Sequence, residues 1–185
     1  PHLGASTEEA QVNVAIDIAE QIIDVLQGRP ARAAVNMPAL SAEALATVGP
    51  YIALAEKIGS LHTQLSRDLE GRGQPIEAVE VIFQGDFSDL PTDPITRAVL
   101  AGVLSPVLSD PVNLVNAPVL AASRGLQVTE SHTTTHGEYS TMLTVRSRSA
   151  GGERTICGTV FGRSDIRIVH IDGYRVDIVP SGALL

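Results

Sequence analysis

The chain has 185 residues, 44% of them hydrophobic and 18% charged, which is enough for one ordinary domain to bury a core without disulfides or metals. A net charge of −8 and only 3% aromatic residues argue against a nucleic-acid partner, which would need basic side chains and stacking rings. The single Cys157 excludes a disulfide framework and a zinc site built on several thiolates. No apolar run approaches the ~20 residues of a membrane span and no signal peptide is visible, so we expect a cytoplasmic protein without a membrane partner.

Residues 6–29 predict one long N-terminal helix. Ser6 and Glu9 have the spacing of a capping box, and the Gly-Arg-Pro run at residues 28–30 supplies a stop. Apolar residues recur at intervals of three and four, at Val12, Ala15, Ile16, Ala19, Ile22, Ile23 and Leu26. Because further apolar residues lie off this stripe, we expect the helix to pack on more than one partner, or on a second copy of the chain.

A connector over residues 31–40 marks the expected domain boundary. A second helix is predicted to begin at Pro50, a residue suited to the first helical position, and to end near Leu69. Residues 76–84 then place apolar side chains at every second position, which predicts a strand.

A third helix is predicted from Ile95 to Leu108, with Asp93 as its cap, and a short helix from Asn116 that Gly125 would close. From residue 126 onward the pattern changes to β, with strands predicted at 126–130, 138–148, 154–161, 165–171 and 174–179.

The dipeptide Asp172-Gly173 separates the last two predicted strands and is the strongest hairpin signal in the chain. Helices come first along the sequence and strands last. This order predicts an α+β fold in which helices pack on a mainly antiparallel β-sheet, preceded by the one long N-terminal helix.

Charge is distributed unevenly along the chain. Residues 1–93 hold 14 acidic and 5 basic residues, whereas residues 94–185 hold 7 acidic and 8 basic ones. Six Arg residues fall within the strand region, at positions 146, 148, 154, 163, 167 and 175. Because a guanidinium presents a fork of donors that suits carboxylates and phosphates, they indicate a small-anion site on the sheet. The alternative is that they lie on solvated faces of edge strands, where charge prevents aggregation.

Other polar residues carry weaker signals. His132 and His136 are four apart, but their Thr neighbours favour strand or loop, where the two rings cannot share a metal without a bend, so no metal site is predicted. We expect His62 at the border of its helix and His170 in a structural role. Cys157, inside a predicted strand, is expected to be a buried and inert thiol.

The run Pro1-His2-Leu3-Gly4 places a His on a tight turn just before the first helix. An imidazole at such a position can exchange a proton near neutral pH, or it can be an incidental terminal residue. The run lacks a Met and begins inside a turn motif, so we interpret the sequence as a piece of a longer protein.

Residues 1–11, Pro-His-Leu-Gly-Ala-Ser-Thr-Glu-Glu-Ala-Gln, resemble the motif that closes the catalytic core of the D-3-phosphoglycerate dehydrogenases. The rest of the chain resembles the long type of that family, which carries an extra intervening domain before a C-terminal ACT domain. The segments that carry this resemblance are 28–30 with 34–36, 112–118, 124–128, 158–162 and 167–173.

The resemblance implies an enzyme that oxidises 3-phosphoglycerate to 3-phosphohydroxypyruvate with NAD, the first step of serine synthesis. His2 matches the catalytic His, which takes the hydroxyl proton as hydride leaves, and His2, Leu3, Gly4 and Ala5 match the turn beside the NAD. The substrate Arg and the dinucleotide fingerprint are expected upstream. This piece alone is therefore expected to be inactive and to bind no NAD.

The resemblance also implies a domain organisation. Residues 1–29 match the last turn and helix of the catalytic core, residues 30–181 the intervening domain, also called the allosteric substrate-binding domain, and residues 182–185 the start of the ACT domain. The expected assembly is a homodimer or homotetramer.

In some members of the family, the intervening domain binds phosphate or the phosphorylated substrate through a cationic cluster near its last hairpin. Arg167 and Arg175 match cationic positions of that cluster, while Tyr174 and Val179 replace basic residues. The resemblance thus implies an effector site for phosphate or 3-phosphoglycerate at Arg167, Arg175 and Tyr174, with fewer cations than in those members.

Two alternatives remain for this region. One is a passive dimerisation or spacer module without a ligand. The other is the related domain of an iron–sulfur L-serine dehydratase, against which the N-terminal motif and the single Cys157 argue.

Overall fold

The computed structural model describes residues 6–26, 42–66, 73–87, 90–134 and 137–182. The chain forms two compact units, Pro1–Leu45 and Ala46–Leu185. Within the described residues, no helix has both the length and the apolar character needed to cross a membrane.

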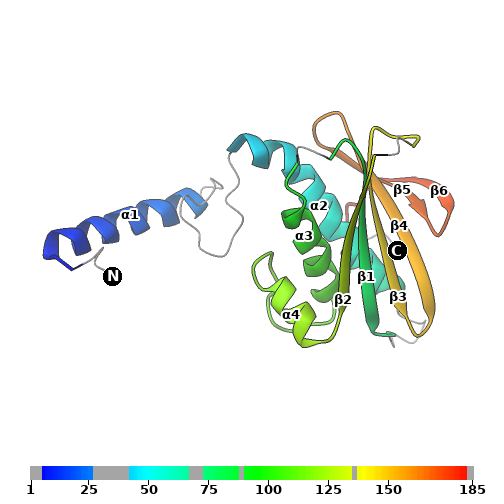
Figure 1. Cartoon of the computed structure of the whole chain (residues 1–185), viewed down its shortest axis with the longest axis horizontal. Coiled ribbons are helices and arrows are strands. Elements are labelled where there is room, and N and C mark those ends of the chain that lie inside the picture. The colour runs from blue at the N-terminus through cyan, green and yellow to red at the C-terminus, as the bar shows by residue number, and fades with distance from the viewer. Residues whose placement is uncertain (1–5, 27–41, 67–72, 88–89, 135–136, 183–185) are drawn as a thin grey trace. The chain divides into compact units, whose positions relative to one another are not determined.

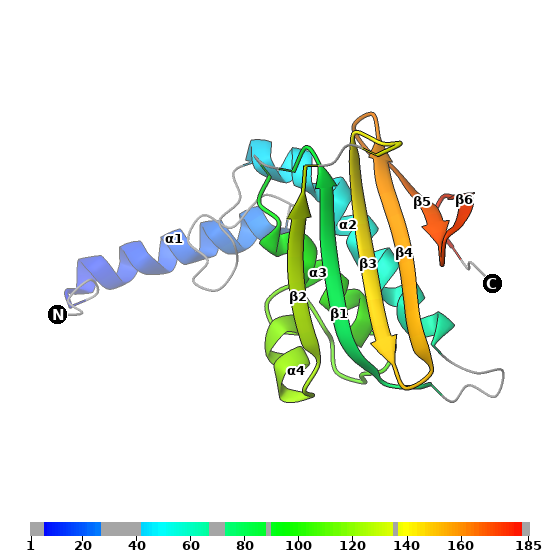
Figure 2. The same ribbon diagram turned by 45° about the vertical axis from the view of Figure 1, so that its right-hand side comes forward.

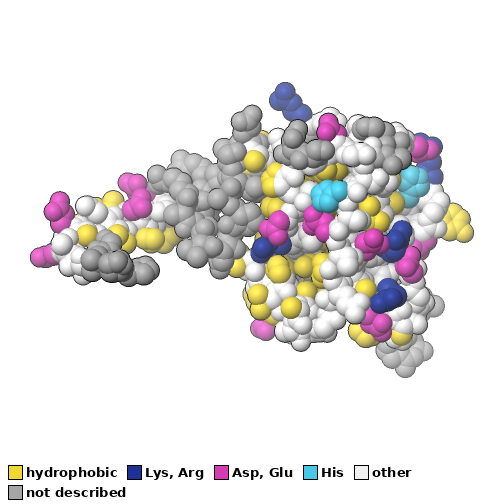
Figure 3. Space-filling model, in the orientation of Figure 1, with side chains coloured by type: hydrophobic (Ala, Val, Ile, Leu, Met, Phe, Trp, Pro, Cys, Tyr) yellow, Lys and Arg dark blue, Asp and Glu magenta, His cyan; other side chains and the backbone are white. Residues whose placement is uncertain are grey.

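The first unit is described through α1, Glu8–Leu26, which confirms the predicted N-terminal helix (Figure 1). At its first turn the Thr7 hydroxyl accepts a hydrogen bond from the Ala10 N–H at 3.2 Å. Side chains on several sides of α1 are about half exposed: Val12, Val14, Ile16, Ile18, Ile22 and Ile23, between 46% and 54%. Figure 3 shows both hydrophobic and acidic side chains on the visible face of this helix.

The second unit contains a six-stranded sheet in the order β2-β1-β3-β4-β5-β6. The strands are β1 Ile76–Gly85, β2 Gln127–Thr133, β3 Thr141–Ser149, β4 Gly152–Phe161, β5 Asp165–Ile171 and β6 Tyr174–Ile178. Only β1 and β2 pair in parallel, and every other neighbouring pair is antiparallel. The α+β fold with a mainly antiparallel sheet is therefore confirmed.

Among the described residues, three helices accompany the sheet: α2 Ala42–Leu65, whose first turn belongs to the first unit, α3 Asp93–Leu104 and α4 Ala117–Ser123. Figure 2 shows the strands in front with α2 and α3 covering one face. The alternation predicted for β1 is confirmed, because Val79, Val81 and Phe83 are buried in the core beneath these helices. The parallel pairing of β2 with β1 follows from the segment containing α3 and α4, which returns the chain to the same end of the sheet.

The start of α2 was predicted wrongly. The helix begins at Ala42, so Pro50 lies inside it rather than at its first position. A proline in a helix interior loses a backbone hydrogen bond. Packing offsets this loss, because the extra turns place Val48 at 0% exposure beside Tyr51 in the core.

Two further capping predictions have different outcomes. Thr92, not Asp93, is the residue before α3, and Asp93 instead forms a 2.7 Å ion pair with Arg97 one turn later. The short helix α4 does begin directly after Asn116, and Gly125 ends that segment with a φ of +69°.

The predicted hairpin between β5 and β6 is confirmed. Asp172 and Gly173 have φ angles of +50° and +82°, as a two-residue turn between antiparallel strands requires. The Asp172 carboxylate also accepts a hydrogen bond from the Thr155 N–H at 2.8 Å, which ties the turn to β4.

Candidate functional site

Arg167 lies on the sheet face that turns away from the helices, here called the open face. The strand register pairs it with Thr159 of β4, whereas the next residue, Ile168, pairs with Gly158. A Cβ added to Gly158 would touch side chains of α2, so Gly158 and Ile168 face the helices. Since successive strand residues point to opposite faces, Arg167 is on the open face.

The Arg167 guanidinium is already engaged by two carboxylates. Its Nε and Nη2 each lie 3.0 Å from an oxygen of Asp165, and its Nη1 lies 2.9 Å from Asp177 on β6. The hydrogen bonds to Asp165 have the largest effect and that to Asp177 the next largest, and both raise the pKa of Arg167, so the guanidinium stays charged. An anion at this residue would have to compete with both carboxylates.

Arg175 and Tyr174 are more accessible. Arg175 pairs in register with His170, is 71% exposed and lies 3.7 Å from the nearest Glu138 oxygen, a loose ion pair. Tyr174 is 77% exposed. Of the predicted effector residues, Arg175 therefore has the cation most open to a solute.

Tyr139 also lies beside this region, and the sequence analysis did not single it out. Its ring centre is 5.9 Å from that of Phe161 and 6.5 Å from that of His170. Because Tyr139 belongs to the loop between β2 and β3, no periodic pattern predicts its place near the open face. His170 packs against this ring, in agreement with its expected structural role.

Two of the four other arginines in this region are held by carboxylates. Arg146 lies 2.7 Å from Glu80, and Arg154 lies 2.8 Å from Asp172. Arg148 and Arg163 are exposed, and within the described part of the chain neither forms an ion pair. The Arg-rich stretch thus contains several ion pairs with carboxylates, and its arginines Arg146, Arg154 and Arg167 lie on interior strands rather than on the edge strands that the alternative predicted.

His62 is not at the border of its helix, as predicted, but fully buried between α2 and β3. Its Nε2 donates to the Val145 carbonyl at 3.1 Å, and the Ser147 hydroxyl lies 2.7 Å from Nδ1. The carbonyl can only accept, so Nε2 carries the proton and Nδ1 accepts from the hydroxyl. Burial lowers the pKa of His62 to about 4, which keeps the ring neutral near neutral pH.

Cys157 is buried as predicted, and burial raises the pKa of its thiol. His132 lies at the exposed edge of β2, with Nε2 2.9 Å from Glu130, while His136 is outside the described residues. Among the residues that the structure describes, no group of three His, Cys, Asp or Glu side chains could hold a metal ion.

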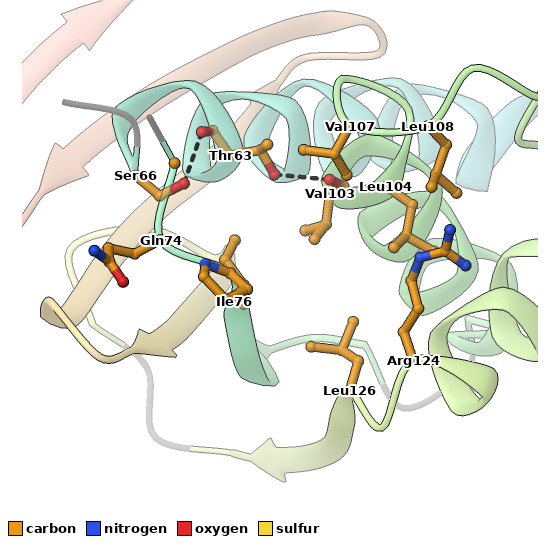
Figure 4. Close-up of a pocket in the computed structure, with 12 residues that line it drawn as sticks. Thr63, Ser66, Gln74, Ile76, Val103, Leu104, Val107, Leu108, Arg124 and Leu126 are labelled. Atoms are coloured by element: carbon orange, nitrogen blue, oxygen red, sulfur yellow. Dashed lines mark hydrogen bonds between the residues drawn. The ribbon is translucent and has the colours of Figure 1, made fainter. Parts of the chain in front are cut away.

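A cavity of about 450 Å³ opens at the end of the helical layer, and no sequence motif indicated it. Figure 4 shows it between the last turns of α2 and α3, the first residue of β1 and the segment from Arg124 to Leu126. Its apolar lining comes from Ile76, Val103, Leu104, Val107, Leu108 and Leu126. Two polar side chains, Gln74 and Arg124, stand at its edge.

The predicted catalytic residue His2 and the predicted NAD-contacting residues Leu3, Gly4 and Ala5 lie outside the described residues. The same holds for the connector over residues 31–40. Two candidate sites therefore lie within the described residues. They are the β5–β6 hairpin and the cavity at the end of α2 and α3.

Together these observations define a small α+β domain with a covered sheet face, an open charged face and no assembled catalytic group among its described residues. Comparison with known proteins identifies the family. Residues 47–172 match the family model of the D-3-phosphoglycerate dehydrogenase intervening domain, and the chain belongs to that family.

Several relatives are similar to the chain over its whole length. It is 40% identical to a D-3-phosphoglycerate dehydrogenase of Synechocystis sp., and the match covers 100% of this chain and 32% of that protein. It is 39% identical to one of Methanocaldococcus jannaschii, and that match covers 100% of this chain and 34% of that protein. It is 40% identical to the chloroplastic D-3-phosphoglycerate dehydrogenase 2 of Arabidopsis thaliana over 132 residues, which is 70% of this chain and 20% of that protein. The chain thus spans about a third of the length of the first two relatives.

Proposed function

We propose that the whole protein is an NAD-dependent D-3-phosphoglycerate dehydrogenase, and that the second unit of this chain is its intervening domain. The observation that carries this proposal is the similarity over the full length of the chain to relatives of that name, together with the match at residues 47–172. In this proposal, His2 takes the hydroxyl proton of 3-phosphoglycerate while hydride passes to NAD, and residues 1–29 belong to the catalytic core.

The dehydrogenase proposal is tested by NADH formation. The full-length protein is expected to reduce NAD when D-3-phosphoglycerate is added, and the 185-residue chain is expected not to. A full-length protein that folds but forms no NADH with this substrate would overturn the proposal.

For the intervening domain, we propose that the β5–β6 hairpin binds a small phosphorylated effector through Arg175 and Arg167. Arg175 supports this proposal because its guanidinium is exposed and only loosely paired. Arg167 is in hydrogen-bonding contact with Asp177 on β6, so an anion that attracts Arg167 would loosen the link between the two strands. Binding of an anion at the hairpin would therefore weaken the contact between β5 and β6, the strand at the edge of the sheet.

A passive dimerisation or spacer module is the second candidate. The specific observation in its favour is that three nitrogens of Arg167 already contact carboxylates, which leaves the hairpin with three acids around two cations. In that case the domain would contribute surfaces for assembly and would bind no effector.

Thermal unfolding in phosphate separates the two candidates. Phosphate at about ten times its Kd should stabilise the folded chain by about 1.4 kcal/mol, which raises the melting temperature by a few degrees. The substitution Arg175→Ala should abolish the increase. Arg163→Ala removes an exposed arginine from the turn before β5 that pairs with no carboxylate of the described residues, and it should leave the increase intact. No increase over chloride of equal ionic strength, or an equal increase in all three proteins, would favour the passive module.

A further inference from the structure

The cavity at the end of α2 and α3 has a volume typical of sites for small molecules, at about 450 Å³. Its interior is apolar: Val103 and Leu104 come from α3, and Leu126 precedes β2 (Figure 4). An apolar interior of this size favours a ligand that brings hydrocarbon with it, because burying apolar surface is the main source of affinity in such sites.

The hydroxyl groups that line the cavity have no proton left for a ligand. The Thr63 hydroxyl donates to the Val103 carbonyl at 2.7 Å, and the Ser66 hydroxyl donates to the Thr63 carbonyl at 2.8 Å, as the dashed lines of Figure 4 show. These two hydroxyl groups can therefore accept a hydrogen bond from a ligand but cannot donate one to it. The side-chain donors that remain are the Gln74 amide and the Arg124 guanidinium.

Arg124 differs from the four closely paired arginines of the domain. Arg97, Arg146, Arg154 and Arg167 each lie within 3.0 Å of a carboxylate oxygen, whereas no carboxylate of the described residues pairs with Arg124. The backbone of Arg124 is nevertheless fixed, because its N–H bonds to the carbonyls of α4 at the end of that helix. In Figure 4 its side chain extends along the cavity edge towards Leu104 and Leu108.

We propose that this cavity binds a small monocarboxylate with a short hydrocarbon chain, with the carboxylate on Arg124 and the chain against Val103, Leu104 and Leu126. The forked guanidinium matches a carboxylate, which can take two parallel hydrogen bonds from it. A phosphate dianion would bring about two negative charges to a cavity edge where Arg124 supplies one positive charge. The carbonyl ends of α2 and α3 carry partial negative charge, which opposes an anion, so binding of the carboxylate depends on the Arg124 guanidinium. The proposal does not depend on dehydrogenase activity.

Titration of the 185-residue chain with hexanoate tests the proposal, with hexylammonium as the charge-reversed probe. By the affinity per atom of small ligands, hexanoate should bind with a Kd on the order of 1 mM and shift the NMR signals of the residues around the cavity. Hexylammonium should leave them unchanged. No binding of hexanoate at about ten times this Kd, or equal binding of both probes, would overturn the proposal.

Three variants locate the site. Arg124→Gln should weaken hexanoate binding by about tenfold or more, because it removes a charged hydrogen-bonding partner. Val107→Trp, at an exposed residue of the lining, should fill the cavity and abolish binding. Arg163→Gln, a matched change at another exposed arginine, should have no effect. Unchanged affinity in Arg124→Gln or in Val107→Trp, in proteins that remain folded, would contradict the site.

Discussion

At the scale of single residues, the polar side chains of the core are satisfied by partners far away in the sequence. His62 meets Ser147 and Val145, which are more than 80 residues further along the chain. The sequence shows only that His62 lies beside apolar helix positions, which is why its burial could not be predicted. Arg167 is a similar case, because its position was suggested by a motif but its pairing with Asp177 depends on the register of β5 and β6.

The burial of His62 predicts a dependence of stability on pH. Its pKa is about 4 in the folded chain, against 6.5 as the ordinary value, so the unfolded chain binds more protons in this interval and stability falls as the pH falls. Burial is the main cause, and among the charged groups nearby Arg154 lowers the pKa further while Asp172 raises it. Between pH 7 and pH 5 the free energy of unfolding should drop by about 2 kcal/mol on this account.

Urea unfolding at the two pH values measures this drop in the intact chain and in His62→Gln, which cannot titrate. The variant should be less stable at pH 7, since it disturbs a buried pair of hydrogen bonds, but its stability should change far less between pH 7 and pH 5. An equal drop in both proteins would show that His62 is not its source.

At the scale of elements, α2 and α3 cross at two glycines, each of which faces the backbone of the other helix. A Cβ on Gly59 would collide with the Val99 carbonyl, and a Cβ on Gly102 would collide with the Glu56 carbonyl. This close approach allows both helices to cover the same face of the sheet. Nothing in the helical periodicity marks it, since glycine inside a helix reads only as a residue of low propensity.

Alanine at either crossing glycine should destabilise the fold. Gly59→Ala and Gly102→Ala should each lower the free energy of unfolding by about 2 kcal/mol or more, because backbone atoms must move to admit the methyl group. Gly49→Ala is the control within α2, where a Cβ would meet no atom of another element within 4 Å, and it should change stability far less. Similar changes at all three positions in denaturant unfolding would refute the close crossing.

The elements differ in how far the sequence predicts them. The alternation in β1 and the Asp172-Gly173 turn depend on local geometry, and both were predicted correctly. The start of α2 was missed because packing of Val48 outweighs the local signal of Pro50. The cavity could not be predicted either, because its walls come from four separate segments that only the tertiary fold brings together.

At the scale of the whole molecule, net charge is a poor guide to partners. The value of −8 hides an arginine-rich second half, and that half is neutralised mainly by carboxylates on neighbouring strands. Arg175 at the hairpin has only a loose carboxylate partner, and Arg124 at the cavity has none among the described residues. Arg148 and Arg163 also lack a partner there, so the candidate sites are selected by local pairing together with position, at the hairpin or beside the apolar cavity, rather than by total charge.

We propose that the second unit regulates or assembles a D-3-phosphoglycerate dehydrogenase and supplies no catalytic group to it. The most direct test is NADH formation by the full-length protein from D-3-phosphoglycerate, measured with residues 42–181 present and with them replaced by a short linker. The account predicts that both proteins form NADH and that only the intact one responds to phosphate. Loss of all turnover on removal, in a protein whose remaining domains fold and bind NAD, would contradict it.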